Sequence, residues 1–228
     1  MESAMIQPAK VTHFTQQGYK LKGLIHGGAS DGEEIPSYQE LGIENILCFE
    51  PLLSARRKFE ESYPDVPCYG TALSDRHGRA QLLITKGDGQ GSSLLEPIIN
   101  HPEVQKNWTD NAVVVGTETV TLTRLDDFFR YNHPDFNTSD YDCLVLDTQG
   151  NEWEVLHGCG SLLRGFKYIS VELSETPVYE GEHPGQEVID WLVKQGFTQD
   201  TPLQSHNDVF FIRSDIKVES ELTYYGLA

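Results

Sequence analysis

The sequence predicts an α/β fold in which one open, mostly parallel sheet carries helices on both faces. Three observations lead to this prediction. The chain has 228 residues, of which 38% are hydrophobic, so it can bury one sizeable core. Strand and helix patterns alternate along most of its length. No repeat, low-complexity block or Pro/Gly-rich linker divides it, and a chain that alternates in this way forms a parallel sheet buried on both sides.

The N-terminal part of the chain predicts three strands separated by two helices. Short apolar runs predict the strands at residues 21–26, 45–49 and 66–73. The helices are predicted between them, at residues 33–41 and 52–62. Because parallel strands need a crossover connection, this order suits a parallel sheet.

The middle of the chain is less regular. A turn at residues 74–78 leads into a strand at 81–85, whereas residues 94–112 are polar and irregular. Alternating Val and Thr predict a strand at 113–122. Residues 123–130 begin with a capping-box pattern, with Asp in place of Glu, and predict a short helix.

The C-terminal part returns to clear alternation. Residues 141–146 form the most evident buried strand, and Asn151 is expected to cap the next helix with Glu154 at the matching third position. The chain then continues with a strand at residues 166–173, a helix at 184–195 and a final hairpin that pairs 196–197 with 208–212.

The net charge of the chain limits the kinds of molecule that it is expected to bind. The 17 Lys and Arg residues against 35 Asp and Glu residues give a net charge of −18. Because a polyanion would be repelled, we expect no binding to nucleic acid or to an anionic membrane. A small neutral or cationic ligand fits this charge more easily.

The sequence also predicts the compartment. No run approaches the roughly 18 apolar residues of a transmembrane helix, and residues 1–10 lack the layout of a signal peptide. The four cysteines are widely spaced without a CxxC pair, which favours free, buried thiols in a reducing environment. We therefore expect a cytoplasmic protein.

Candidate ligand-binding positions follow from the fold, because open α/β sheets bind ligands beyond the carboxyl ends of their strands. Gly28 and Gly32 follow the first strand, allow a tight turn and precede a helix with free N–H groups. Glu50 ends the second strand about 20 residues on, where a carboxylate can accept both hydroxyls of a ribose. This combination indicates an adenosine-containing ligand. An ordinary turn with a surface glutamate is the alternative.

A series of short motifs runs in order from about Leu24 to Arg213. They are Gly28-Ala29-x-x-Gly32, Phe49-Glu50-Pro51, Ala72-Leu73-Ser74-Asp75, Ser92-Ser93-Leu94, Thr121-Leu122, Leu125-Asp126-Asp127-Phe128, Leu146-Asp147-Thr148-Gln149-Gly150-x-Glu152, Val155-Leu156-x-Gly158, Val171-Glu172 and Gly196-Phe197. Together they resemble the FkbM-type methyltransferases, a family of S-adenosylmethionine-dependent enzymes.

The resemblance implies a Rossmann-like class I methyltransferase fold: a seven-stranded, mostly parallel sheet with a C-terminal antiparallel hairpin and helices on both faces. The methyltransferase domain would span residues 21–213, between an N-terminal extension at 1–20 and a C-terminal tail at 214–228. The implied reaction moves a methyl group from S-adenosyl-L-methionine to a small-molecule hydroxyl acceptor. We expect that acceptor to be a sugar or a glycosylated or polyketide-like compound.

The resemblance also implies the cofactor contacts. The loop after the first strand would hold the methionine portion, and Glu50 would hold the ribose. Ser74 and Asp75 would lie near the adenine. The full set implied for the cofactor is His26, Gly28, Ala29, Ser30, Gly32, Glu50, Ala72, Ser74, Asp75, Asp147 and Gln149. For His26, a hydrogen bond to a neighbouring backbone group is the alternative.

An acceptor hydroxyl has a high pKa, so a positioned base should accelerate transfer. The candidates are Asp147, Glu172 and His206, and for His206 a turn cap is the alternative. A divalent metal held by Asp147 could acidify the hydroxyl instead. No spacing in the sequence indicates a metal site, so none is assigned.

Acceptor contacts are expected from the loops at residues 87–112 and 174–185, through Ser92, Ser93, Trp108 and Tyr179. The glycine-rich stretch 87–93 lacks the GK[ST] ending of a phosphate-binding loop. It is either a flap over the site or a plain hairpin loop. An exposed strand edge or the N-terminal segment could mediate a homodimer, and residues 1–19 otherwise look peripheral.

Three departures from the family pattern lie near the cofactor: His26 replaces an acid, Ser30 an asparagine and Val145 a lysine. His26 and Val145 keep open the alternative of a non-catalytic S-adenosylmethionine-binding protein of the same fold. A nicotinamide-dependent oxidoreductase is a further alternative, although the strict GxGxxG pattern is absent after the first strand.

Overall fold

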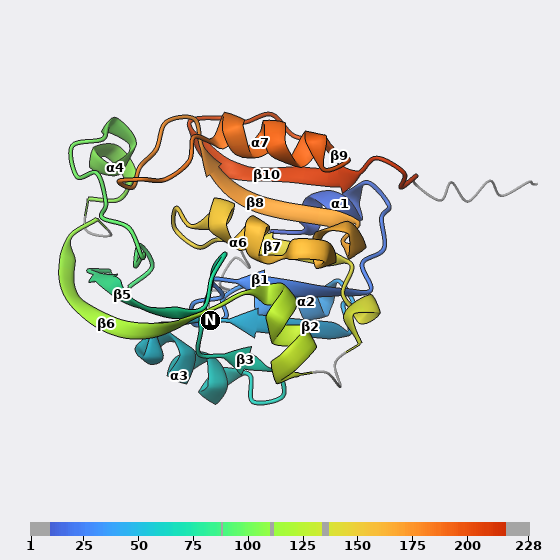
Figure 1. Ribbon diagram of the computed structural model, residues 1–228, viewed down its shortest axis with the longest axis horizontal. Coiled ribbons are helices and arrows are strands. Elements are labelled where there is room, and N and C mark those ends of the chain that lie inside the picture. The colour runs from blue at the N-terminus through green and yellow to red at the C-terminus, as the bar shows by residue number, and fades with distance from the viewer. Residues whose placement is uncertain (1–9, 88, 110–111, 134–136, 218–228) are drawn as a thin grey trace, which may run out of the picture.

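A seven-stranded sheet runs through the centre of the molecule (Figure 1). The computed structural model describes residues 10–87, 89–109, 112–133 and 137–217; the first nine residues of the expected N-terminal extension and residues 218–228 of the expected tail lie outside the described residues. The strands, in chain order, are β1 (Gly23–Gly27), β2 (Asn45–Phe49), β3 (Cys68–Tyr69), β7 (Cys143–Leu146), β8 (Tyr168–Ser174), β9 (Phe197–Gln199) and β10 (His206–Arg213).

The strand order across this sheet is β3-β2-β1-β7-β8-β10-β9. All neighbours are parallel except β10, which runs antiparallel to both β8 and β9. The order reverses between β1 and β7, which makes their carboxyl ends the topological switch point. The predicted class I methyltransferase fold, with its C-terminal antiparallel hairpin, is confirmed.

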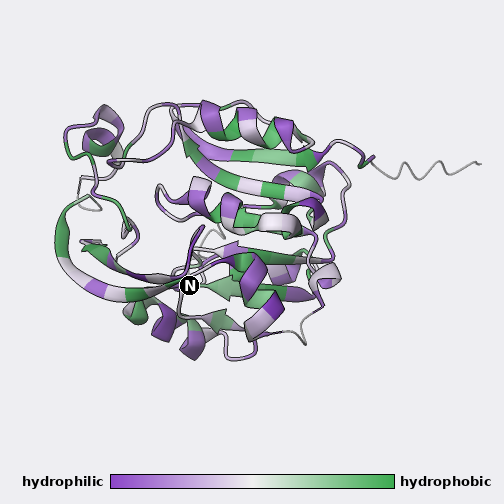
Figure 2. Cartoon of the chain, viewed as in Figure 1, coloured by the Kyte–Doolittle hydropathy of each residue, from purple (hydrophilic) through white to green (hydrophobic). Residues whose placement is uncertain are grey.

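Both faces of the sheet are buried under helices. Along β7, Leu144 and Leu146 join one buried cluster, whereas Cys143 and Val145 join the other, as the two-residue period of a strand requires. The helices are α1 (Thr12–Gln16), α2 (Ile35–Glu40) and α3 (Leu53–Ser62) on one face, and α5 (Leu125–Asp127), α6 (Glu152–Gly158) and α7 (Gly185–Lys194) on the other. Figure 2 shows hydrophobic residues gathered in the central strands and polar residues on the outer helices.

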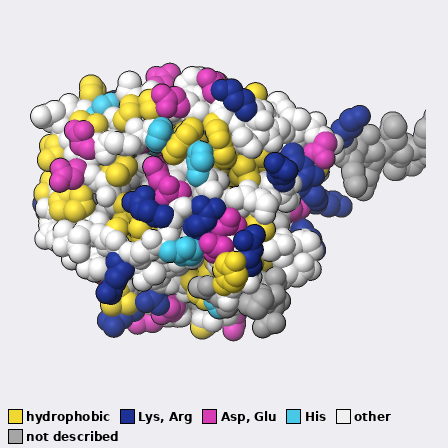
Figure 3. All heavy atoms as spheres, in the orientation of Figure 1, with side chains coloured by type: hydrophobic (Ala, Val, Ile, Leu, Met, Phe, Trp, Pro, Cys, Tyr) yellow, Lys and Arg dark blue, Asp and Glu magenta, His cyan; other side chains and the backbone are white. Residues whose placement is uncertain are grey.

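A second, three-stranded sheet consists of β4 (Ala72–Leu73), β5 (Gly78–Thr85) and β6 (Val114–Thr123), in the order β4-β6-β5. The long β5–β6 ribbon curls away from the main sheet in Figure 1. Hydrophobic side chains lie on the surface over β6 in Figure 3, and Val115 exposes 62% of its area. The homodimer expected from the sequence stays a prediction.

The prediction of one strand over residues 66–73 was wrong. The chain pairs with β2 only as far as Tyr69, and Ala72-Leu73 then pair with β6 in the other sheet. A Cβ on Gly70 would lie 2.7 Å from the Arg56 side chain, and the Thr71 hydroxyl donates to the Thr121 carbonyl at 2.9 Å. The chain therefore crosses between the two sheets at Gly70 and Thr71.

The two predicted helix caps were also wrong. Arg124, not Thr123, precedes α5, and the Thr123 hydroxyl pairs with that of Thr71 instead. Asn151 does precede α6, but its side-chain amide donates to the Leu73 carbonyl at 2.8 Å. Asn151 therefore joins the start of α6 to β4, whereas Thr123, the last residue of β6, holds the crossing at Thr71.

The remaining helical segments are short. Residues expected to be irregular contain α4 (Pro102–Asn107), and a π-helical turn at Phe128–Asn132 extends α5. The 3-10 turns lie at Thr138–Asp140 and Gly160–Gly165. The four cysteines are free thiols, three of them buried and Cys68 half-buried. Among the described residues, no helix has the length and apolar character needed to cross a membrane.

Candidate active site

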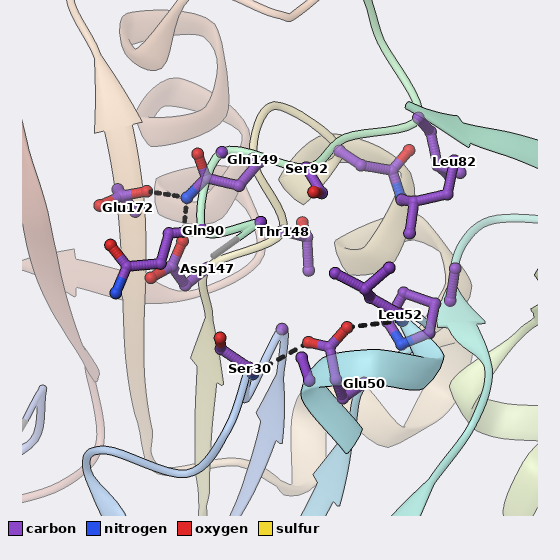
Figure 4. Close-up of a pocket in the computed structure, with 18 of the residues that line it drawn as sticks. Ser30, Glu50, Leu52, Leu82, Gln90, Ser92, Asp147, Thr148, Gln149 and Glu172 are labelled. Atoms are coloured by element: carbon purple, nitrogen blue, oxygen red, sulfur yellow. Dashed lines mark hydrogen bonds between the residues drawn. The ribbon is translucent and has the colours of Figure 1, made fainter. Parts of the chain in front are cut away.

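A cavity of about 440 Å³ lies where the carboxyl ends of β1, β2, β7 and β8 meet (Figure 4). Gly28, Glu50, Asp147 and Glu172 each contribute to its wall from a different strand end. The second sheet and the loop after β5 supply the opposite wall, including Leu82. This volume is in the range that holds a small-molecule ligand. The predicted site residues Gly28, Glu50, Ala72, Asp147 and Glu172 therefore all line one cavity.

The loop after β1 first reaches the cavity with its backbone, at Gly28. Gly28 has φ +83°, and a Cβ there would lie 1.8 Å from the Asp147 carbonyl oxygen. The Gly28 and Ala29 N–H groups donate to the Phe49 carbonyl, which fixes the turn against β2. The Asp147 backbone leaves no room for a side chain at Gly28, so the loop packs directly against the end of β7 at the point where Gly28 lines the cavity.

Glu50 holds this loop and the start of α3 together. Its Oε2 accepts from the Ser30 N–H at 2.9 Å and its Oε1 from the Leu52 N–H at 2.7 Å, both drawn in Figure 4. Burial raises the pKa of this carboxyl to about 7, although the two N–H groups lower it. Glu50 therefore lines the cavity as a carboxyl that changes charge near neutral pH.

A chain of polar contacts links the ends of β7, β8 and β10. Gln149, with φ +54°, donates its side-chain amide to Asp147 Oδ1 and to Glu172 Oε2 (Figure 4). Glu172 Oε1 lies 3.2 Å from His206 Nε2, and His206 Nδ1 lies 2.9 Å from the Ser174 hydroxyl. The three predicted base candidates thus share one network.

The titratable groups of this network differ in the direction in which the protein shifts their pKa values. Burial favours the neutral form of Asp147, but the Lys10 ammonium, with the hydrogen bonds to Glu172 and Lys10, outweighs burial and holds the Asp147 pKa well below its usual range. Burial, followed by repulsion from Asp147, raises the pKa of Glu172 to about 7. Burial lowers the pKa of His206, but its contact with Glu172 and the charges of Asp147 and Glu182 together raise it by more. The Glu172–His206 pair can therefore accept a proton near neutral pH, whereas Asp147 stays ionised.

Lys10 is the site residue that the sequence did not reveal. Its Nζ lies 2.9 Å from Asp147 Oδ2 and 3.2 Å from Asp208 Oδ1. Residues 1–19 had looked peripheral, yet Lys10 lines the cavity. Neither its neighbours in sequence nor its spacing marks it, and only the docking of α1 beside the sheet brings it there.

The residues predicted to contact the acceptor lie together. Trp108 lines the cavity, and its ring centroid is 4.2 Å from that of His206. The Tyr179 hydroxyl donates to Gln149 Oε1 at 2.6 Å, and the Ser93 hydroxyl donates to the Gln149 carbonyl at 2.6 Å. Ser92 lines the cavity from the loop after β5, which forms one of its walls in the structure.

Other predicted cofactor residues lie behind the wall. His26 is buried, with Nδ1 3.3 Å from the Tyr38 hydroxyl and no described partner at Nε2, and burial lowers its pKa to about 4. Ala29 is buried, and Gly32 turns back onto it and faces Phe59. Ala72 lines the cavity, whereas Ser74 and Asp75 are not among the described residues that do.

The described residues contain no group of three or more His, Cys, Asp or Glu side chains arranged to hold a metal ion. The charge beside Asp147 comes from Lys10.

Comparisons with known proteins agree with this geometry. The model of the methyltransferase FkbM domain matches residues 26–198. The 2-O-methyltransferase NoeI of Sinorhizobium fredii (strain NBRC 101917 / NGR234) is 26% identical over 170 residues, which cover 72% of this chain and 68% of NoeI.

Solved structures resemble the chain more remotely. The 1,6-didemethyltoxoflavin-N1-methyltransferase of Burkholderia thailandensis has a TM-score of 0.47 at 11% identity, covering 94% of this chain and 80% of that one. Magnesium protoporphyrin IX methyltransferase of Synechocystis PCC 6803 has a TM-score of 0.43 at 9% identity, covering 90% and 76%. The strand order described above, not these similarities, carries the fold assignment.

Proposed function

The chain belongs to the FkbM family of S-adenosylmethionine-dependent methyltransferases, and from this premise we propose that it methylates a hydroxyl group of a sugar or of a glycosylated or polyketide-like small molecule. The observation that carries the proposal is the Glu172–His206 pair, which lines the same cavity as Gly28 of the loop after β1. A hydroxyl must lose its proton as the new bond forms, and this pair is poised to take it. The 2-O-methyltransferase activity in the name of NoeI supports transfer of the methyl group to an oxygen atom.

The residues present fit S-adenosylmethionine. The backbone beside Gly28, where a Cβ would meet Asp147, would receive the methionine portion, and the Glu50 carboxylate would accept from the ribose hydroxyls. When bound, the cofactor supplies a methyl group on a positively charged sulfur, so that transfer is a direct displacement. Asp147 and Gln149 would orient the reacting groups, which is the main contribution a protein makes to such a reaction.

The charge of the cavity favours an uncharged acceptor. Its described wall carries the carboxyl groups of Glu33, Glu34, Glu50, Asp147, Glu172 and Asp208. Lys10 is the one lysine or arginine side chain of that described wall. A phosphate or carboxylate on the acceptor would be repelled, whereas a neutral sugar would not. Trp108 and Tyr179 offer it aromatic surfaces.

The first experiment incubates the purified protein with S-adenosylmethionine and a panel of neutral saccharides and glycosides, and detects methylated products by mass spectrometry. We expect O-methylated product from the wild type. His206→Asn should lower kcat by roughly 10²–10⁴-fold, because the base is lost. His183→Asn, a partly exposed histidine beside α7, is the matched control and should behave as the wild type.

A calorimetric titration with S-adenosylhomocysteine, with NAD as control, accompanies the assay. Binding of the former with product on an amine but on no hydroxyl would overturn the proposed acceptor class. Binding without any product across the panel would favour the non-catalytic alternative. Full activity of His206→Asn would remove the Glu172–His206 pair from the mechanism.

A further inference from the structure

The Lys10 ammonium lies at the centre of three carboxylates that come from different elements. It is 2.9 Å from Asp147, 3.2 Å from Asp208 and 4.0 Å from Glu172, and its side chain is only 12% exposed. Asp147 follows β7, Glu172 is on β8 and Asp208 is on β10. Through the Lys10 ammonium group, the segment before α1 therefore forms ion pairs with carboxylates from three strand regions.

Without this charge the cluster would be electrostatically unfavourable. Gln149 is neutral, and its amide is shared between Asp147 and Glu172. His206 contacts Glu172 Oε1, the same oxygen that lies 4.0 Å from the Lys10 ammonium. Three half-buried carboxylates gathered around one point repel one another, because partial burial weakens the screening by water. One of them would then take up a proton or turn away.

We propose that Lys10 is a positioning residue for methyl transfer: its ammonium pairs with Asp147 and Asp208, holds them in place, and so leaves the Glu172–His206 pair as the proton acceptor. This proposal rests on the proposed function. In the step it serves, the acceptor O–H bond breaks and its proton passes to the pair. The oxygen lone pair forms the new C–O bond, and the electrons of the broken C–S bond stay on the sulfur.

Several other charges act on the pair, and the effect of Lys10 must be separated from theirs. The titratable groups that face Glu172, His206 or Lys10 from the neighbouring elements are Asp147, Asp208, Glu152, Glu182, Glu34, His26 and Tyr179. Most of them are acids, and their negative charges raise the pKa of the Glu172–His206 pair. The positive charge of Lys10 lowers the pKa of the pair. Removing Lys10 should therefore make the pair more basic.

The test compares Lys10→Met and Lys10→Gln, which remove the charge, with Lys10→Arg, which keeps it. Lys22→Met, a surface lysine paired with Asp140, is the matched control. The first readout is the pH dependence of kcat, and the second is an NMR titration of the His206 imidazole in the S-adenosylhomocysteine complex. Because the second does not need turnover, it separates this proposal from the proposed function.

We expect Lys10→Met to move the acidic limb of kcat and the His206 titration upward by about one pH unit, with activity recovered at higher pH. Lys10→Arg and Lys22→Met should keep the wild-type profile. Lys10→Gln provides the same measurement should the Met variant fail to fold. An unchanged His206 titration in a folded, uncharged variant would overturn the role of Lys10, as would an activity loss that no pH restores. A shifted titration in a protein without methyl transfer would support Lys10 and overturn the proposed function.

Discussion

The protonation state of the buried Glu50 carboxyl should affect the affinity for the cofactor. Its pKa is raised to about 7 by burial, so about half of the molecules carry a neutral Glu50 at that pH. Ribose hydroxyls donate to an ionised carboxylate, and binding must therefore release this proton below pH 7. We expect the Kd for S-adenosylhomocysteine to fall about tenfold between pH 6 and pH 8, measured by calorimetry.

Variants at Glu50 separate this effect from other titrations. Glu50→Gln keeps an oxygen that can accept from Ser30 or Leu52 but cannot ionise, so its affinity should be lower and independent of pH. The surface variant Glu44→Gln should retain both the affinity and the pH dependence of the wild type. The same tenfold change in Glu50→Gln would mean that another group titrates and that Glu50 does not hold the ribose.

Sequence reasoning at the residue scale succeeded where a strand end fixes the position. Glu50, Asp147 and Glu172 each end or follow a strand, and parallel strands bring their ends to one edge. Lys10 and Asp208 could not be found in this way. Lys10 depends on how α1 docks beside the sheet, and Asp208 lies within β10, where alternate side chains point to opposite faces. Which residues meet at such positions depends on the packed tertiary structure.

Helix α6 depends on a glycine for its contact with the loop after β4. A Cβ on Gly158 would lie 2.0 Å from the Ser74 carbonyl oxygen, a backbone atom that cannot move aside. Gly158→Ala should therefore lower the free energy of unfolding by roughly 1–3 kcal/mol, although alanine favours helices. Urea denaturation measures the difference.

Gly165→Ala is the matched control for that helix contact, because a Cβ at Gly165 meets nothing within 4 Å. It should leave stability unchanged or raise it slightly. Equal stability of the two variants would mean that α6 and the β4 loop are not packed as the structure has them. S-adenosylhomocysteine affinity of folded Gly158→Ala tests in addition whether Ser74 and Asp75 contribute to cofactor binding.

The elements that sequence patterns predicted best are the buried ones. β2 has the predicted bounds of 45–49, and β7 lies within the predicted 141–146. The pattern over 66–73 failed because apolar residues indicate burial and not the partner strand. Cys68-Tyr69 and Ala72-Leu73 are suited to strands in either sheet, and Thr71 decides the crossing through a distant contact with Thr121.

The molecule as a whole places several acids where burial keeps them protonated, and a pH dependence of stability follows. Burial raises the pKa values of Glu50 and Glu172 to about 7 and that of Glu152 to about 8, from an ordinary 4.5. A carboxyl with a raised pKa stabilises the folded state below its unfolded pKa, and this stability is lost as pH rises through its folded pKa. His26, with a pKa lowered to about 4, acts in the opposite direction only below its ordinary 6.5. The three glutamates should therefore dominate between about pH 6.5 and 8.5.

In that interval the free energy of unfolding of the protein without ligand should fall by roughly 3 kcal/mol, measured by urea denaturation at the two pH values. Glu152 accepts from the Thr148 N–H at 2.7 Å and lies outside the proposed chemistry, so Glu152→Gln isolates its share. That variant should lose less stability than the wild type over the interval, because its side chain has no proton to release. Stability that rises from pH 6.5 to 8.5 would show that these carboxyls are ionised in the folded state. The neutral form of Glu50 and the raised pKa of Glu172 would then both have to be reassigned.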